Sequence, residues 1–189
     1  MSEYRLQARS PLAGHEQRIG GLSLRELTGQ ALVLVSVAQQ DRDALAQAME
    51  RAFGLSLPAV GQSSLSTDGR LRLLGLQPDR LGLLFEHEQA RPERWVAGAL
   101  GGHAGVVDQS DAWVMLELAG EPVHAVLARL CLLDLDPQAF PVGRVARTVM
   151  EHMAVMILRT GAQGFLLLSP RSSARSFLHA LETSAHNAQ

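Results

Sequence analysis

Hydrophobic residues first form a regular pattern at residues 31–37 (ALVLVSV), a short run rich in β-branched side chains that predicts a strand. Asp41 follows as a candidate helix N-cap, and apolar residues then recur at helical spacing as far as Gly54. This apolar stripe consists of Leu45, Met49 and Phe53. The pattern therefore predicts a strand and then an amphipathic helix that ends at Gly54.

Two further strands and a second helix are predicted before the middle of the chain. A turn-rich loop at residues 61–69 (GQSSLSTDG) leads to predicted strands at residues 71–76 and 81–85. After Arg91 and Pro92, the spacing of Trp95, Val96 and Leu100 predicts a helix. The glycine pair at residues 101–102 predicts its end.

The second half of the chain repeats this order of elements. A helix is predicted to begin at Glu121 and Pro122, a loop to cover residues 134–143, and Ser169 to cap a last helix. The predicted strands cover residues 112–118, 144–150, 154–159 and 165–168. In both halves a strand turns through polar residues and proline into a helix, at residues 82–100 and 164–181.

The repeat predicts an α+β fold made of two ferredoxin-like halves, each with helices on a mostly antiparallel sheet. The two halves are expected at about residues 29–103 and 104–189, within a single domain. Residues 1–28 show no sustained apolar period, and an irregular N-terminal arm is predicted there.

Composition excludes several classes of function. The 17 basic residues nearly balance the 19 acidic ones and form no cluster, so neither nucleic acid nor a membrane surface is expected as a partner. Every basic residue is arginine, and a chain without lysine cannot build a P-loop or a Schiff-base site. The N-terminus lacks the apolar core of a signal peptide, no apolar run is long enough to span a membrane, and Cys131 has no disulfide partner. A cytoplasmic protein is expected.

The motifs that could carry chemistry are weak. The only E-x-x-H spacing, Glu121 to His124, lacks the second copy and the further glutamates of a di-iron site. The glycines at residues 98–105 follow a helix, whereas a dinucleotide loop precedes one. The segment at residues 169–173 (SPRSS) could bind an anion at a helix start, although helix capping explains its first residues equally well. A loop role is expected for Asp134 and Asp136, and no catalytic, cofactor-binding or metal-ligating residue is predicted.

Six short segments of the second half form a pattern that is typical of one protein family. They are DQSD at residues 108–111, LAG at 118–120, VLA at 126–128, CLLDLDP at 131–137, FPVGRVART at 140–148 and SPRS at 169–172. With these segments, the second half of the chain resembles the gamma subunit family of heterotetrameric sarcosine oxidase. The resemblance is strong over the last part of the chain and weaker in SPL at residues 10–12 and LP at 57–58.

This resemblance implies a fold related to that of the folate-binding aminomethyltransferases. It also implies a small non-catalytic subunit in an assembly that demethylates sarcosine to glycine and hydrogen peroxide and passes the one-carbon unit to tetrahydrofolate. In such an assembly FAD, FMN, NAD and tetrahydrofolate are expected in the partner alpha and beta subunits, and no cofactor is expected in this chain. A small delta subunit is a further candidate partner.

The resembling residues have two interpretations, building the fold or contacting the alpha subunit. Trp113, Phe140 and Arg147 are the candidate interface residues, because aromatic side chains and arginine are enriched at hot spots. Three other functions remain open. They are the matching subunit of N-methylglutamate dehydrogenase or a related complex, a free-standing folate-binding protein of the same fold, and a homo-oligomeric scaffold with no flavoenzyme partner.

Overall fold

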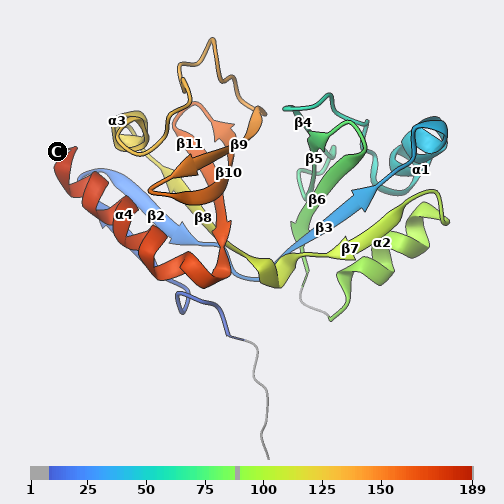
Figure 1. The fold of residues 1–189 in the computed structure, drawn as a ribbon, viewed down its shortest axis with the longest axis horizontal. Helices are drawn as coiled ribbons and strands as arrows, with labels where there is room; N and C mark the ends of the chain where they lie inside the picture. The colour runs from blue at the N-terminus through green and yellow to red at the C-terminus, as the bar shows by residue number, and fades with distance from the viewer. Residues whose placement is uncertain (1–8, 88–89, 189) are drawn as a thin grey trace, which may run out of the picture.

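The computed structural model describes residues 9–87 and 90–188, which form two antiparallel sheets with helices on their outer faces (Figure 1). The five-stranded sheet has the order β4-β5-β6-β3-β7, and the six-stranded sheet the order β1-β2-β8-β11-β10-β9. In the five-stranded sheet the strands are β3 (Gln30–Ser36), β4 (Ser63–Leu65), β5 (Leu71–Gln77), β6 (Arg80–Glu86) and β7 (Gly105–Asp108). In the six-stranded sheet they are β1 (Glu16–Ile19), β2 (Leu22–Glu26), β8 (Trp113–Ala119), β9 (Val145–Met150), β10 (Met153–Gly161) and β11 (Gly164–Pro170).

In the described part of the chain, four α-helices cover the outer faces of the sheets. Helices α1 (Arg42–Phe53) and α2 (Pro92–Leu100) lie on the five-stranded sheet, and α3 (Val123–Ala128) and α4 (Ala174–Asn187) on the six-stranded sheet (Figure 1). Gly54 and Gly101 end α1 and α2 in the left-handed conformation, as their positions predict. Three short 3₁₀ turns, η1 (Gln39–Asp41), η2 (Ser110–Ala112) and η3 (Arg171–Ser173), precede strands or helices.

The inner faces of the two sheets pack against each other, so that the central strands are buried on both sides. In β6, for example, Leu83 packs under α1 and α2, while Leu84 joins Met115 and Met156 between the sheets. This double burial explains the continuous apolar runs of β6 and β11, which lack the alternation of a sheet with one wet face.

The expected α+β fold with two similar halves is confirmed, but the fourth strand of the second half comes from an unexpected place. In the first half, β7 follows α2 and pairs with β3. In the second half the described chain continues after α4 only to Ala188, and β2 takes the equivalent position by pairing with β8, with Leu24 opposite Leu118. The six-stranded sheet is therefore completed by a strand from the beginning of the chain.

The irregular arm predicted for residues 1–28 is thus wrong from Glu16 onward, and the half boundaries at residues 29, 103 and 104 shift with it. Residues 16–26 belong to the second half, and β7 belongs to the first. Ile19, Leu22 and Leu24 are buried, but the tight Gly20–Gly21 turn between them hides the alternation in the sequence. The part of the predicted arm before Arg9 lies outside the described residues.

A buried carboxylate fixes the chain that leads into β1. Glu26, at the end of β2, is 6% exposed and accepts three hydrogen bonds from this segment. The donors are the Ser10 hydroxyl at 2.5 Å, the Leu12 amide at 3.2 Å and the Gly14 amide at 2.7 Å. The N-terminal segment is therefore part of the packed fold from Ser10 onward.

Candidate functional site

The most highly connected polar side chain of the second half is Arg159, near the end of β10. Its residue is 2% exposed, and its guanidinium donates hydrogen bonds to backbone carbonyls rather than to a carboxylate. The acceptors are the carbonyl oxygens of Phe140 at 2.9 Å, Leu135 at 3.4 Å, Gly161 at 3.1 Å and Ala162 at 2.7 Å. Arg159 thereby ties the loop at residues 134–143 to the β10–β11 turn.

His124 lies on the open side of this arginine. Its Nε2 is 3.3 Å from Nη2 of Arg159 and 3.2 Å from the carbonyl oxygen of Ala162. Its ring meets that of Phe165 edge-on, with the centroids 5.4 Å apart, and Arg159 lies 5.5 Å from the same ring centroid. His124, the histidine of the E-x-x-H motif, therefore makes contacts that stabilise the fold. Residues 9–87 and 90–188 contain no group of three acidic, histidine or cysteine side chains that could hold a metal ion.

Asp134 and Asp136 shape the loop that Arg159 holds. Oδ1 of Asp134 accepts a hydrogen bond from the amide of Asp136 at 3.0 Å, and Oδ1 of Asp136 accepts one from the amide of Gln138 at 2.8 Å. Both are local turn contacts of aspartate. The structure thus confirms the loop role expected for these carboxylates.

The three candidate interface residues are not brought together. Phe140 is 4% exposed and packs in the core under α3 and α4, so its side chain is not available to a partner, and its selection was wrong. Trp113, in β8, is half-buried at the edge of the core between the sheets, and Arg147, in β9, is exposed. Strands β11 and β10 separate these last two residues.

The segment at residues 169–173 does not have the geometry expected for an anion site at a helix start. β11 extends to Pro170, η3 follows, and α4 begins only at Ala174, so Ser169 is a strand residue and not a helix cap. Its hydroxyl is buried without a hydrogen-bond partner. Arg171 forms an ion pair with Asp111 at 3.6 Å and also donates to the carbonyl oxygen of Arg9.

Cys131 is buried beside β9 and forms a bridge with Met150. Burial raises the pKa of its thiol, and hydrogen bonding with Leu133 and Thr148 opposes that shift only in part. Since the thiolate is the reactive form, Cys131 is suited to packing rather than to nucleophilic attack.

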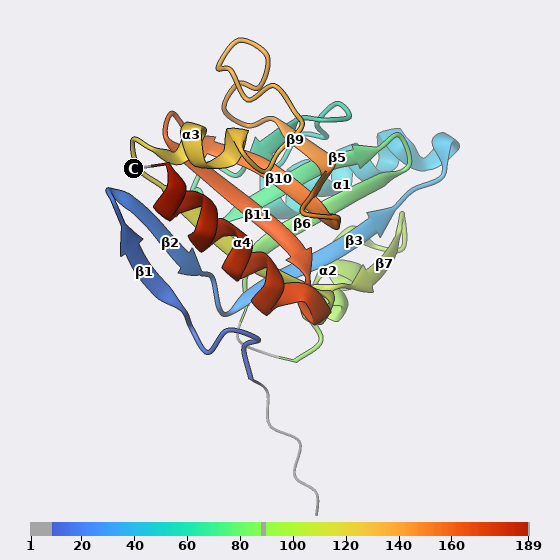
Figure 2. The ribbon, with the colours of Figure 1, turned by 60° about the vertical axis from the view of Figure 1, so that its left-hand side comes forward.

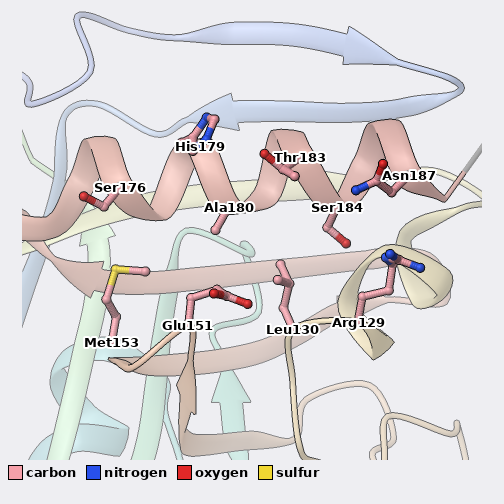
Figure 3. Close-up of a pocket in the computed structure, with 10 residues that line it drawn as sticks. All are labelled: Arg129, Leu130, Glu151, Met153, Ser176, His179, Ala180, Thr183, Ser184 and Asn187. Atoms are coloured by element: carbon pink, nitrogen blue, oxygen red, sulfur yellow. The ribbon is translucent and has the colours of Figure 1, made fainter.

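A groove of about 510 Å³ lies between α4, the end of α3 and the β9–β10 turn (Figure 3). Polar side chains of α4 line one wall, and Arg129 and Glu151 lie on the other. Glu151 and His152 both have positive φ in this tight turn. The groove combines the Glu151 carboxylate, the Arg129 guanidinium and several hydroxyl groups of α4. Among its lining residues, Glu151 has positive φ. The lining residues are Arg129, Leu130, Glu151, Met153, Ser176, His179, Ala180, Thr183, Ser184 and Asn187.

A sequence model of the sarcosine oxidase gamma subunit family matches residues 38–187. The chain belongs to this family. The match begins far ahead of the segments that carried the strong part of the resemblance, so the first half shares the family pattern as well. Phe140 and Gly143, both in the resembling segment, sit at the loop that Arg159 holds, and this part of the family pattern therefore builds the fold.

Two relatives from the same family have similar sequences. The sarcosine oxidase subunit gamma of Arthrobacter sp. is 35% identical over 123 residues, which is 64% of this chain and 60% of the relative. That of Corynebacterium sp. strain U-96 is 36% identical over 128 residues, or 67% of this chain and 61% of the relative. The matched region thus spans about 60% of the length of these relatives.

Solved structures extend the likeness to the whole fold. A chain of heterotetrameric sarcosine oxidase from Corynebacterium sp. U-96, solved with pyrrole 2-carboxylate, matches with a TM-score of 0.79 and 27% identity over 96% of both chains. The glycine cleavage system aminomethyltransferase T from Bartonella henselae matches with a TM-score of 0.65 and 20% identity, over 85% of this chain and 45% of that one. The expected relation to the aminomethyltransferase fold is confirmed at the level of fold.

No pattern in the sequence singled out Arg159 as a functional residue. Arg159 directly follows Val155–Leu158, a run in which every residue is buried. It therefore lies in a strand that is buried on both faces. An arginine at such a position needs several acceptors, because burying an unpaired charge is costly. That expectation could have identified Arg159 as the anchor of a loop.

Proposed function

We propose that this chain is the small non-catalytic subunit of a heterotetrameric sarcosine oxidase. It supports the oxidative demethylation of sarcosine to glycine, with transfer of the one-carbon unit to tetrahydrofolate. The observation that carries the proposal is the match to a chain of heterotetrameric sarcosine oxidase over 96% of both chains.

In this proposal the chemistry takes place in the partner alpha and beta subunits, which hold FAD, FMN, NAD and tetrahydrofolate in the cytoplasm, with a small delta subunit completing the assembly. The local geometry supports this division. The Arg159 guanidinium and the Glu26 carboxylate are committed to backbone groups, and the Cys131 thiol is buried. These side chains therefore stabilise the fold, and the folded chain offers its surface to a larger partner.

No helix in the described part of the chain has the length and apolar character needed to cross a membrane.

Two other functions make distinguishable predictions. A gamma subunit of N-methylglutamate dehydrogenase or a related complex would have the same fold but would assemble with subunits that oxidise a different N-methyl amino acid. A free-standing folate-binding protein has support at the level of fold, from the likeness to aminomethyltransferase T. It would bind tetrahydrofolate without any partner.

The test is to purify the tagged chain from a cytoplasmic extract of its native cells and to identify by mass spectrometry what accompanies it. Larger flavin-containing subunits in equimolar amount are expected, and the recovered complex should consume sarcosine faster than N-methylglutamate. The isolated chain, prepared in parallel, should show neither turnover nor visible flavin absorption. Recovery of the chain alone, or sarcosine oxidation by it, would refute the proposal.

A further inference from the structure

Backbone hydrogen bonds join the two sheets where β9 of the six-stranded sheet approaches the segment that leads into β4. Gln62 and Arg144 form a bridge there, and the Val145 amide donates to the carbonyl oxygen of Gly61 at 3.0 Å. The Ser63 hydroxyl donates to the carbonyl oxygen of Gly143 at 2.8 Å. This junction, which we call the seam, joins equivalent edges of the two halves, because β4 and β9 occupy the same end position in their sheets.

Exposed apolar side chains concentrate at the seam. Seven large hydrophobic residues are exposed in the described part of the chain, and four of them lie on the two segments that meet there, residues 56–65 and 141–150. They are Val60 (52%), Leu65 (48%), Val142 (56%) and Val149 (50%). Scattered exposed apolar residues need no explanation, but a concentration on adjoining segments marks an interaction surface.

The charges at the seam have one sign. Neither segment contains an acidic residue, whereas the second contains Arg144 and Arg147. Arg72 stands opposite Leu65 in the β4–β5 pair, and it donates to the Ser63 hydroxyl at 3.1 Å. Arg72 is only partly exposed, and this burial lowers the pKa of its guanidinium. None of the three arginines takes part in an ion pair among residues 9–87 and 90–188.

The backbone at the seam is also open to a partner. β9 is the last strand of its sheet, paired with β10 on one side and touched on the other only near its ends, by Gly61 and Cys131. Figure 2 shows the loop before β9 and the turn before β4 at the same end of the molecule, away from α4. An open edge strand with exposed valine and arginine is a surface that proteins usually cover.

We infer that the seam surface, made of Val60, Leu65, Val142, Val149, Arg144 and Arg147, docks onto a larger subunit of the complex through an apolar patch flanked by carboxylates. This inference rests on the proposed function, since the occupant is the assembly's own subunit. Apolar side chains supply the buried contact, and the arginines supply electrostatic complementarity to acidic residues of that subunit.

The experiment is reconstitution of the complex from the purified chain and the larger subunits encoded in the same genome. Binding would be measured for the wild type, R147E and V149E, with R94E and V107E as matched controls. Val107 is also an exposed valine on an edge strand, but in β7 at the other end of the five-stranded sheet, and Arg94 is exposed on α2. Thermal unfolding of each isolated variant would confirm that it folds.

We expect R147E and V149E each to weaken binding about tenfold or more, and the two controls to bind like the wild type. In the wild-type complex, amide exchange in residues 141–149 should slow relative to the isolated chain. If R147E and V149E both bind like the wild type, and if complex formation does not change amide exchange in residues 141–149, the docking inference is overturned while the proposed function remains intact. A wild-type chain that binds no larger subunit would overturn the proposed function itself. A self-associated chain that R147E disperses in sedimentation would instead assign the seam to a second copy of the chain and overturn the inference.

Discussion

Gly75 and Arg159 occupy equivalent positions in the two halves, at the bulges of β5 and β10. The amide of Gly75 donates to the carbonyl oxygen of Gln62, and its own carbonyl accepts from Gly61, both at 2.8 Å. Arg159 makes the same pair of bonds, to Arg144 at 3.0 Å and from Gly143 at 2.9 Å. The two halves thus share one backbone arrangement at the seam but complete it with opposite side-chain solutions, a missing side chain in one half and a long cationic one in the other.

Replacing Gly75 with alanine should be severely destabilising. A Cβ at this position would lie 2.2 Å from the carbonyl oxygen of Ala59 and 2.9 Å from its carbonyl carbon, and both are backbone atoms that cannot move aside without breaking the seam. We expect a loss of about 3 kcal/mol or more in the free energy of unfolding, measured by urea denaturation. Gly98 in α2 is the control, because its Cβ would meet nothing within 4 Å, and G98A should stabilise the helix by about 0.5–1 kcal/mol. Equal stability of the two variants would contradict this account.

Arg159→Met should release the loop at residues 134–143. The substitution keeps a long apolar side chain but leaves the carbonyls of Phe140 and Ala162 without their donor, and hydrogen bonds from charged donors contribute about 1.5–3 kcal/mol each. We expect a loss of about 3 kcal/mol in unfolding free energy and faster proteolytic cleavage within the loop. Arg159→Lys should recover little, because one ammonium group cannot reach acceptors on both segments. R147M, which changes an exposed arginine of the seam surface, should unfold like the wild type in isolation.

Periodicity and turn residues predicted most of the fold because each half forms its hairpins and helices from contiguous sequence. The parallel between residues 82–100 and 164–181 corresponds to β6–α2 and β11–α4. The β1–β2 hairpin could not be found in this way, since its place depends on β8, far away in the chain. Ser169 was misplaced for a related reason: the hydroxyl and proline pattern of a helix start gives way to strand pairing with Val114.

The candidate site was less predictable than the fold. Aromatic and arginine residues of the resembling segments were chosen by residue type, and type alone does not reveal that Phe140 points into the core. Three of the six seam-surface residues are valines, and nothing in the sequence distinguishes them from other apolar residues. Their exposure becomes apparent only in the folded chain, where β9 lies beside the segment before β4.

Two buried serines, Ser169 in β11 and Ser184 in α4, should respond to alanine substitution in opposite directions. The Ser169 hydroxyl is fully buried without a partner, so S169A removes an uncompensated polar group and should raise the unfolding free energy by about 1 kcal/mol. The Ser184 hydroxyl donates to the carbonyl oxygen of Val126 at 2.8 Å, so S184A should lower it by a similar amount. Denaturant titration of both variants tests the pair, and a loss of stability in S169A would show that the Ser169 hydroxyl has a partner in solution.

Glu26→Gln should loosen the segment before β1. The two carboxylate oxygens accept hydrogen bonds from the amides of Leu12 and Gly14, so either orientation of the glutamine places its NH₂ group against an N–H donor. We expect a loss of about 1–3 kcal/mol in unfolding free energy and faster hydrogen exchange at these two amides. Glu16→Gln, at an exposed position of β1, should change neither quantity. Unchanged exchange in E26Q would show that other contacts hold this segment.

Cys131 should make the stability of the chain fall in alkaline solution. Burial raises the pKa of its folded-state thiol above the ordinary value of 9.0. Between pH 9.0 and the higher folded-state pKa, the unfolded state has lost the thiol proton while the folded state keeps it, so the unfolded state binds fewer protons. The free energy of unfolding then decreases as pH rises, because its slope follows the difference in bound protons. The contribution is intact below pH 9.0 and is lost above it, as pH rises toward the higher folded-state pKa. Urea denaturation of the wild type and of Cys131→Ala across this range would isolate the effect, since the other titrating groups are common to both proteins. A stability difference that stays constant with pH would mean that the thiol ionises as readily in the fold as in the unfolded chain.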